Sequence, residues 1–148
     1  MKSLYLAAIF LFTGYISFGQ CDPTLNKYIY HPDRLVVIKE CTTVTGIVTA
    51  VISDPDGDYH IRLKLDAGQE DLLNGKNKTA QHGCLVVEII CAHKVTQKDA
   101  MKSCASCKNK IKKPNKGDHI TVTGRLVTDN VHGWNEIHPA SSISLIIR

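Results

Sequence analysis

Hydrophobic and polar residues alternate most regularly in the segment YHIRLKLD, residues 59–66. Its odd-numbered positions are apolar or aromatic, and its even-numbered positions are His60, Arg62, Lys64 and Asp66. Successive side chains of an extended chain point to opposite faces. The segment therefore predicts a half-buried β-strand with a polar, mostly basic outer face. The Asp56-Gly57 pair just before it predicts a tight hairpin turn.

Four other segments have the composition of strands. Residues 41–53 are rich in Val, Ile and Thr and follow a short apolar run at 34–40, and residues 84–91 are apolar apart from Glu88. Residues 117–129 alternate, and residues 143–147 form a short apolar end. Such β-branched runs favour strands over helices.

Two of these strands resemble each other around an internal glycine, VTGIV at 44–48 and VTGRLV at 122–127. A glycine inside a strand often marks a bulge or a sharp bend, as the corners of small barrels require. Between the strands, the pattern predicts a helical turn at 71–73 and a short helix from about Thr96, ended by Pro114. The predicted fold class is therefore all-β, a closed five-stranded barrel with a small helical excursion.

The chain divides into three parts by composition. Residues 1–20 combine a basic start, an uncharged apolar run and small residues, which is typical of a secretory signal peptide. The apolar run is shorter than the roughly 20 residues of a membrane-spanning helix, which argues against an N-terminal anchor. Residues 21–33 read as a leading loop, and residues 34–148 as the barrel domain. A lipid anchor on Cys21 is an alternative, although Gln20 is larger than the residue that usually precedes such a cysteine.

All six cysteines follow the predicted signal peptide. An even number of cysteines in an exported chain predicts three disulfides. We expect Cys21 to pair with Cys41, and Cys91 with either Cys104 or Cys107. The candidate disulfide cysteines are Cys21, Cys41, Cys84, Cys91, Cys104 and Cys107. A zinc site of Cys91, His93, Cys104 and Cys107 is the alternative, although the first two ligands are closer in sequence than is usual.

Charge is concentrated in residues 92–116, which contain eight lysines and one acidic residue, Asp99. A segment this basic attracts polyanions in a salt-dependent way. The candidate ligand-binding residues are His60, Arg62, Lys64, Lys108, Lys110, Lys112 and Lys113. The predicted outer faces of the second and third strands offer no aromatic side chain on which nucleic acid bases would stack. The alternative is a solvated basic loop without a ligand.

The run DNVHGWNEIHPAS, residues 129–141, holds the only tryptophan. On an extended chain Trp134, Glu136 and His138 share one side. If the fold brings His60 to this side, His60, Glu136 and His138 are candidate ligands for a metal such as zinc. The alternative is a polar network at one end of the barrel, with Trp134 as an apolar plug.

Two short motifs carry less weight. Residues 54–58 resemble the start of a calcium loop, but the twelfth position is Leu65 rather than the acidic ligand that an EF-hand requires. The triplet Asn77-Lys78-Thr79 matches a glycosylation sequon, which matters only in a host that modifies such sites.

The segments DGDYHIRLKLD, HGCLVVEIIC, GDHITVTG and HGWNEIHP resemble a group of small exported bacterial proteins with no established activity. The resemblance covers roughly residues 34–146 and implies a fold like the oligonucleotide/oligosaccharide-binding (OB) barrel and an extracytoplasmic location. We expect a secreted binding module for an anionic polymer, such as a glycan, a cell-envelope component or a nucleic acid. The alternatives are a metal-dependent hydrolase or nuclease that uses Glu136 and His138, and a structural accessory domain without catalytic or binding activity.

Overall fold

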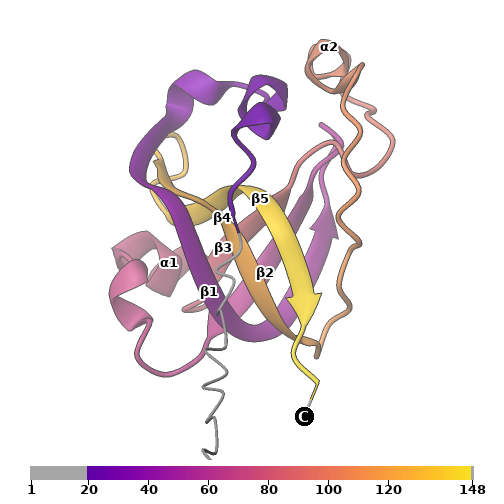
Figure 1. Cartoon of the computed structure of the whole chain (residues 1–148). Coiled ribbons are helices and arrows are strands. Elements are labelled where there is room, and N and C mark those ends of the chain that lie inside the picture. The colour runs from indigo at the N-terminus through magenta and orange to yellow at the C-terminus, as the bar shows by residue number, and fades with distance from the viewer. Residues whose placement is uncertain (1–19, 148) are drawn as a thin grey trace, which may run out of the picture.

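The computed structural model describes residues 20–147 and shows five strands that close into a barrel in the order β1-β2-β3-β5-β4 (Figure 1). The strands are β1 (Leu35–Ser53), β2 (Tyr59–Leu65), β3 (Leu85–Ile89), β4 (His119–Asp129) and β5 (Asn135–Leu145). The prediction of an all-β fold is confirmed. The predicted signal peptide at 1–20 lies almost entirely outside the described residues. No helix within residues 20–147 has the length and hydrophobicity needed to cross a bilayer.

The helical elements are short and lie outside the barrel wall. They are the 3-10 helices η1 (Pro23–Tyr28), η2 (Pro32–Arg34) and η3 (Glu70–Leu72), and the α-helices α1 (Gly75–Ala80) and α2 (Met101–Cys104). In Figure 1, α1 and α2 lie on opposite sides of the barrel. The predicted helix from Thr96 is only four residues long. It begins at Met101, and Thr96 instead donates its backbone N–H to the oxygen of Pro55 at 2.8 Å.

Strand β1 forms the seam that closes the barrel. Its first part, Leu35 to Ile47, pairs with β4, and its last part, Gly46 to Ser53, pairs with β2. Gly46 therefore has neighbours on both sides, Leu65 and Ile120. A Cβ atom at Gly46 would lie 2.3 Å from the backbone oxygen of Lys64, so the close approach of β2 requires a residue without a side chain.

Substitution of Gly46 by alanine is expected to lower the free energy of unfolding by about 1–3 kcal/mol, because backbone atoms must move to admit the methyl group. Urea denaturation of the purified protein measures this change. The matched control is Gly75→Ala at the start of α1, where no atom lies within 4 Å of the new Cβ. That variant should be as stable as the parent, or more stable by up to about 1 kcal/mol. Equal losses in both variants would contradict the argument.

Inward-pointing side chains of all five strands form one apolar core. It includes Ile61 and Leu63 of β2, Val87 of β3 and Ile137 of β5, all fully buried. The residues between them in sequence point outward, so the predicted alternation of β2 is confirmed. The predicted bounds of the last strand, 143–147, are wrong. β5 begins at Asn135, within the segment DNVHGWNEIHPAS, and ends at Leu145.

Candidate functional site

A pocket of about 310 Å³ lies outside the barrel wall, where the β1–β2 turn (54–58) faces the β4–β5 turn (130–134). Its wall includes outward-pointing residues of β2, β3 and β5. Five carboxylates line it: Asp54, Asp56, Asp58, Glu88 and Glu136. Three imidazoles line it as well: His60, His132 and His138. Among the described lining residues, Arg34 is the only lysine or arginine, so the pocket is rich in acidic groups.

The pairing of three strands explains why these residues meet. His60 of β2 is the antiparallel partner of Glu88 of β3, and β3 runs parallel to β5 with Val86 beside Glu136. Side chains in such neighbouring positions project from the same face of a sheet. The three residues proposed from the sequence as metal ligands, His60, Glu136 and His138, therefore line one pocket.

The hydrogen bonds of His60 define which ring nitrogen carries the proton. The side-chain oxygen of Gln81 accepts the Nε–H of Arg62 at 2.8 Å and lies 3.3 Å from His60 Nε2. Since that oxygen only accepts, His60 Nε2 is the donor. In the neutral ring, Nδ1 then carries a lone pair, and it lies 3.0 Å from a carboxylate oxygen of Glu88. Burial lowers the pKa of His60 and so favours the neutral ring.

Two lone pairs cannot face each other at that distance without a proton or a cation between them. Burial and the nearby Glu136 raise the pKa of the Glu88 carboxyl well above the ordinary value, which favours a proton on Glu88 when no cation is bound. Its second oxygen, Oε2, is buried and has no hydrogen-bond partner among the described residues. The sequence analysis assigned no role to Glu88, which is the acidic partner of His60.

Glu136 joins two other residues of the pocket. One oxygen accepts the indole N–H of Trp134 at 2.9 Å, and the other lies 2.9 Å from His138 Nδ1. The other ring nitrogen of His138, Nε2, points away from Glu136. Nε2 is buried without a hydrogen-bond partner in the described part of the chain. The prediction that Trp134, Glu136 and His138 share one side is confirmed by these bonds.

The interpretation of Trp134 as an apolar plug is wrong. The indole is only partly buried and stacks on His132, with ring centroids 4.4 Å apart and planes within 8°. It also meets the edge of His60 at a centroid distance of 6.0 Å. The barrel is filled by aliphatic residues instead. Trp134 therefore forms an aromatic wall of the outer pocket.

Asp58 is buried beside the pocket at the end of the β1–β2 turn. Its Oδ1 accepts the backbone N–H of Cys91 at 2.7 Å. Burial, together with the charge of Asp56, raises its pKa to about 7. The loss of solvation outweighs the single hydrogen bond that favours the ionised form.

The acidic turn is fastened to the segment after β3. The oxygen of Gly57 accepts the backbone N–H groups of Ala92 and His93, and the oxygen of Pro55 accepts those of Thr96 and Gln97. These four bonds have lengths between 2.8 and 3.1 Å. We call this segment, residues 92–97, the strap. It holds the carboxylates of the turn against β2 and β3.

One group of pocket residues has the spacing of metal ligands. Ligand atoms of Asp54, His60 and Glu88 lie within 4.8 Å of one another. A second group, Asp58 with Cys91 and Cys104, is equally compact, but the two sulfurs are bonded to each other. Only the first group therefore has free ligand atoms.

The cysteines form two disulfides, Cys21–Cys41 and Cys91–Cys104. The expected first pair is confirmed, and of the two partners left open for Cys91 the structure selects Cys104. The expected third disulfide is wrong, because Cys84 and Cys107 are free thiols. The zinc site of Cys91, Cys104 and Cys107 with His93 is wrong as well, because Cys91 and Cys104 are bonded to each other. Cys84 precedes β3 whereas Cys107 lies beyond its other end, and a disulfide needs Cα atoms within about 7 Å.

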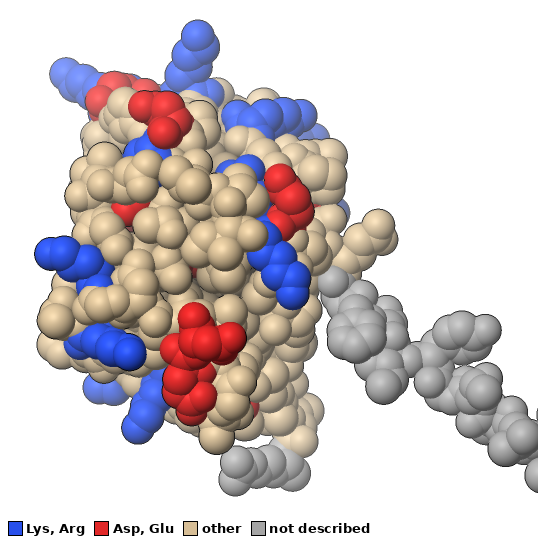
Figure 2. Space-filling model, turned by 90° about the vertical axis from the view of Figure 1, so that its left-hand side faces the viewer, with Lys and Arg blue, Asp and Glu red and all other residues tan. Residues whose placement is uncertain are grey.

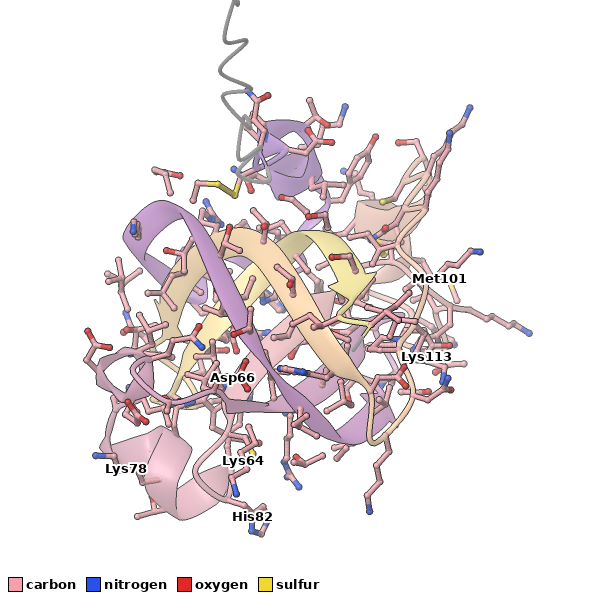
Figure 3. All side chains as sticks on the ribbon, turned by 60° about the horizontal axis from the view of Figure 1, so that its bottom comes forward. Lys64, Asp66, Lys78, His82, Met101 and Lys113 are labelled. Atoms are coloured by element: carbon pink, nitrogen blue, oxygen red, sulfur yellow. A yellow bond between two sulfur atoms is a disulfide. The ribbon has the colours of Figure 1, made fainter. Side chains whose placement is uncertain are left out.

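The basic residues proposed as a ligand surface do not form one patch. Arg62 is engaged with Gln81 beside the pocket, whereas Lys64 is exposed. In Figure 3, Lys64 lies in the lower part of the view and Lys113 lies apart from it, on the right. Figure 2 shows a face on which both signs of charge are interspersed.

A second concavity, the lysine groove, lies between residues 108–112 and the end of β5. Its volume is about 510 Å³. It is lined by Lys108, Lys110 and Lys112, by the apolar Leu25, Ile111 and Ile143, and by Asp22, Asn109, Ser141 and Ser142. The lysines are exposed, while Ile111 packs against the core and Asn109 donates to the oxygen of Ile90 at 2.7 Å. Along residues 108–112 the lysines therefore point outward, while Asn109 and Ile111 between them point toward the barrel.

The sequence-based prediction missed Asp54, Glu88 and Gln81. Glu88 had a signal, since it is the only charged residue in the apolar strand 84–91 and belongs to the face opposite the core. Asp54 was set aside with the rejected calcium loop. Gln81 had no signal, because its place beside Arg62 depends on α1, which the sequence did not predict.

No protein-family model and no curated protein matches this sequence. The resemblance to small exported bacterial proteins therefore stays a prediction, and the functional argument depends on the geometry of the two concavities.

Proposed function

We propose that this chain is an exported, OB-like binding module that holds an acidic polysaccharide in the lysine groove. The closed strand order β1-β2-β3-β5-β4, with an irregular segment between β3 and β4, supports the OB-like assignment. The two disulfides are what an oxidising, extracytoplasmic location favours. The observation that carries the proposal is a row of exposed lysines along an apolar groove.

The groove suits a sugar chain because it offers two kinds of contact. Leu25, Ile111 and Ile143 provide apolar surface for the C–H faces of sugar rings. Lys108, Lys110 and Lys112 alternate along the rim, where ammonium groups attract carboxylates or sulfates. None of the described residues that line this groove is aromatic, so a single-stranded nucleic acid would lack the stacking that such ligands need. The glycan is therefore favoured over the nucleic acid.

The acidic pocket is unsuited to the same polymer. Five carboxylates and one arginine line it, so a polyanion would meet repulsion there. The lysine groove has a single acidic residue, Asp22, among its described lining residues. The alternative of a metal-dependent hydrolase that uses Glu136 and His138 remains a separate prediction, and its first requirement is a bound metal ion.

The mature protein is expected to bind alginate or heparin with an affinity that falls steeply as salt rises. Replacement of Lys108, Lys110 and Lys112 by serine should weaken binding at least about tenfold. It should also make the slope of log K against log salt concentration less steep by about 2 to 3, by analogy with the counterions released per contact on nucleic acids. Isothermal titration at several salt concentrations measures both effects.

The control is a triple variant of Lys39, Lys64 and Lys78, which are exposed and lie outside the groove. It removes the same charge and should weaken binding much less. Equal losses in the two triple variants would mean that only net charge matters and would refute the groove. Tighter binding of single-stranded oligothymidylate than of either polysaccharide would overturn the choice of a glycan.

A further inference from the structure

The acidic pocket has a second property that polymer binding does not use. Asp54, His60 and Glu88 come from the β1–β2 turn, β2 and β3, and their ligand atoms lie within 4.8 Å of one another. An ion with tetrahedral coordination and bonds of about 2.1 Å places its ligand atoms roughly 3.4 Å apart. Side-chain shifts of about 1 Å would bring the three groups to that spacing.

Two buried polar atoms in the pocket wall lack partners. Glu88 Oε2 and His138 Nε2 are inaccessible and have no hydrogen-bond partner among the described residues, and both side chains are at least nine-tenths buried. Buried polar groups in proteins are nearly always paired, so each such atom needs an explanation. A cation in the pocket supplies a partner for the Glu88 carboxylate.

His60 is held in the orientation that a metal ligand requires. Its Nε2–H donates to Gln81, whose oxygen is itself fixed by Arg62, and Nδ1 faces Glu88 with its lone pair. Histidine ligands of metals usually donate their other ring N–H to an oxygen acceptor, which sets the ring orientation. Arg62 and Gln81 are therefore positioning residues for His60.

The charges of the pocket also favour a dication. Its five carboxyl groups, of which Asp58 and Glu88 favour the protonated form when no cation is bound, face one guanidinium. That guanidinium, of Arg34, forms an ion pair with Asp129 at 3.1 Å. The ligand set combines an imidazole with carboxylates, which suits zinc and its transition-metal neighbours better than calcium or magnesium. Three protein ligands leave one coordination position open toward the pocket.

We propose that Asp54, His60 and Glu88 bind one divalent transition-metal ion of the zinc class, with Arg62 and Gln81 positioning His60. This site differs from the set His60, Glu136 and His138, of which only His60 is a ligand. Glu136 and His138 lie beside the ion in the pocket wall. The site is independent of the lysine groove, so the two proposals stand or fall separately.

The test uses the mature protein with its disulfides intact, treated with chelator and then titrated with ZnCl₂. We expect one equivalent of zinc to bind by isothermal titration and to raise the melting temperature. His60→Ala and Glu88→Gln should each weaken zinc binding at least about 100-fold. Arg62→Leu should weaken it about 10- to 100-fold, the usual range for residues that orient a ligand.

Control variants separate this site from surface binding. His82→Asn removes an exposed histidine at a backbone φ of 56° that asparagine tolerates, and it should change the affinity less than twofold. Melting of each variant without zinc shows that it is folded, and Glu88→Gln should not lower that melting temperature. Cobalt(II), used as a visible probe, should give a tetrahedral spectrum without a thiolate charge-transfer band.

Three results would overturn the proposal: no rise in melting temperature with zinc, unchanged affinity in both His60→Ala and Glu88→Gln, or a thiolate band with cobalt. The last would place the ion on the free thiols of Cys84 or Cys107 instead. If the parent protein binds zinc as expected but binds no polysaccharide, only the proposal for the lysine groove is refuted.

Discussion

Replacement of Asn77 by alanine is expected to lower the free energy of unfolding by about 3–5 kcal/mol, the largest effect of any single substitution considered for this protein. Asn77 is fully buried in α1 and ties together three segments. Its amide nitrogen donates to the oxygens of Cys84 and Asn135, and its oxygen accepts the backbone N–H of Asn135 at 2.9 Å. The same oxygen accepts the N–H of Asn74 as part of the helix cap.

The alanine variant leaves several of these backbone groups without partners, and each buried unsatisfied group costs about 1–3 kcal/mol. Urea denaturation measures the loss. Lys78→Ala, at the exposed next position of α1, is the control and should change stability by less than about 0.5 kcal/mol. A loss below 1 kcal/mol in the Asn77 variant would mean that water replaces the side chain. The burial also explains why the Asn77-Lys78-Thr79 sequon is not accessible for glycosylation in the folded chain.

The second large effect is a loss of stability as pH rises in the absence of metal. Asp58 has a pKa of about 7 in the folded protein against an ordinary value of 3.8. The folded state therefore binds a proton that the unfolded state releases between these values. Its contribution to stability is fully present below about pH 4 and is lost as pH rises through 7. At 1.36 kcal/mol per pKa unit, the loss is about 4 kcal/mol at most.

Two other buried groups of the pocket, Glu88 and His60, also affect how the free energy of unfolding depends on pH. The raised pKa of Glu88 adds to the loss of stability as pH rises, because Glu88 also keeps its proton on folding. The lowered pKa of His60 opposes this loss of stability. Just below pH 6.5 the unfolded state binds a proton on His60 that the folded state does not, so the His60 contribution to stability rises with pH there. The carboxylates of Asp56 and Asp54 favour the protonated form of Asp58, whereas His138 opposes it.

Urea denaturation at pH 5 and at pH 8, both in the presence of chelator, measures the slope. Asp58→Asn mimics the protonated carboxyl and keeps an acceptor for the Cys91 N–H, so it should be more stable than the parent at pH 8 and show a flatter profile. Asp71→Asn, an exposed carboxylate in η3, should retain the parental slope. A parental profile in the Asp58 variant would show that this carboxyl is ionised in the folded state.

Much of the fold was predictable because it depends on local patterns. The alternation of residues 59–66 and the glycines at 46 and 124 reflect the two constraints of a small barrel, an apolar interior and sharply bent strands. α1 was missed because its signal is a capping box between Asn74 and Asn77 in a polar segment, without an apolar face. β5 was cut short because Asn135 to Pro139 are mostly polar, and their partners on β3 and β4 are distant in sequence.

The site was predictable in its residue types but not in its arrangement. His60, Glu136 and His138 were identified because histidine and acidic residues at alternate positions share a face. Their convergence depends on β3 lying between β2 and β5 with parallel pairing to β5, and no local pattern encodes that register. The place of Asp54 beside His60 and Glu88 was not foreseen, because the position of a turn residue relative to two strands is set by the strap.

The strap also determines the entropy of binding at the pocket. Four backbone hydrogen bonds and the Cys91–Cys104 disulfide hold the acidic turn in place before any ligand arrives. A ligand that enters the pocket therefore orders few additional residues, and little of its binding free energy is spent on immobilising the chain. Association should accordingly be governed by the arrival of the ligand and the loss of protons, rather than by closure of a loop.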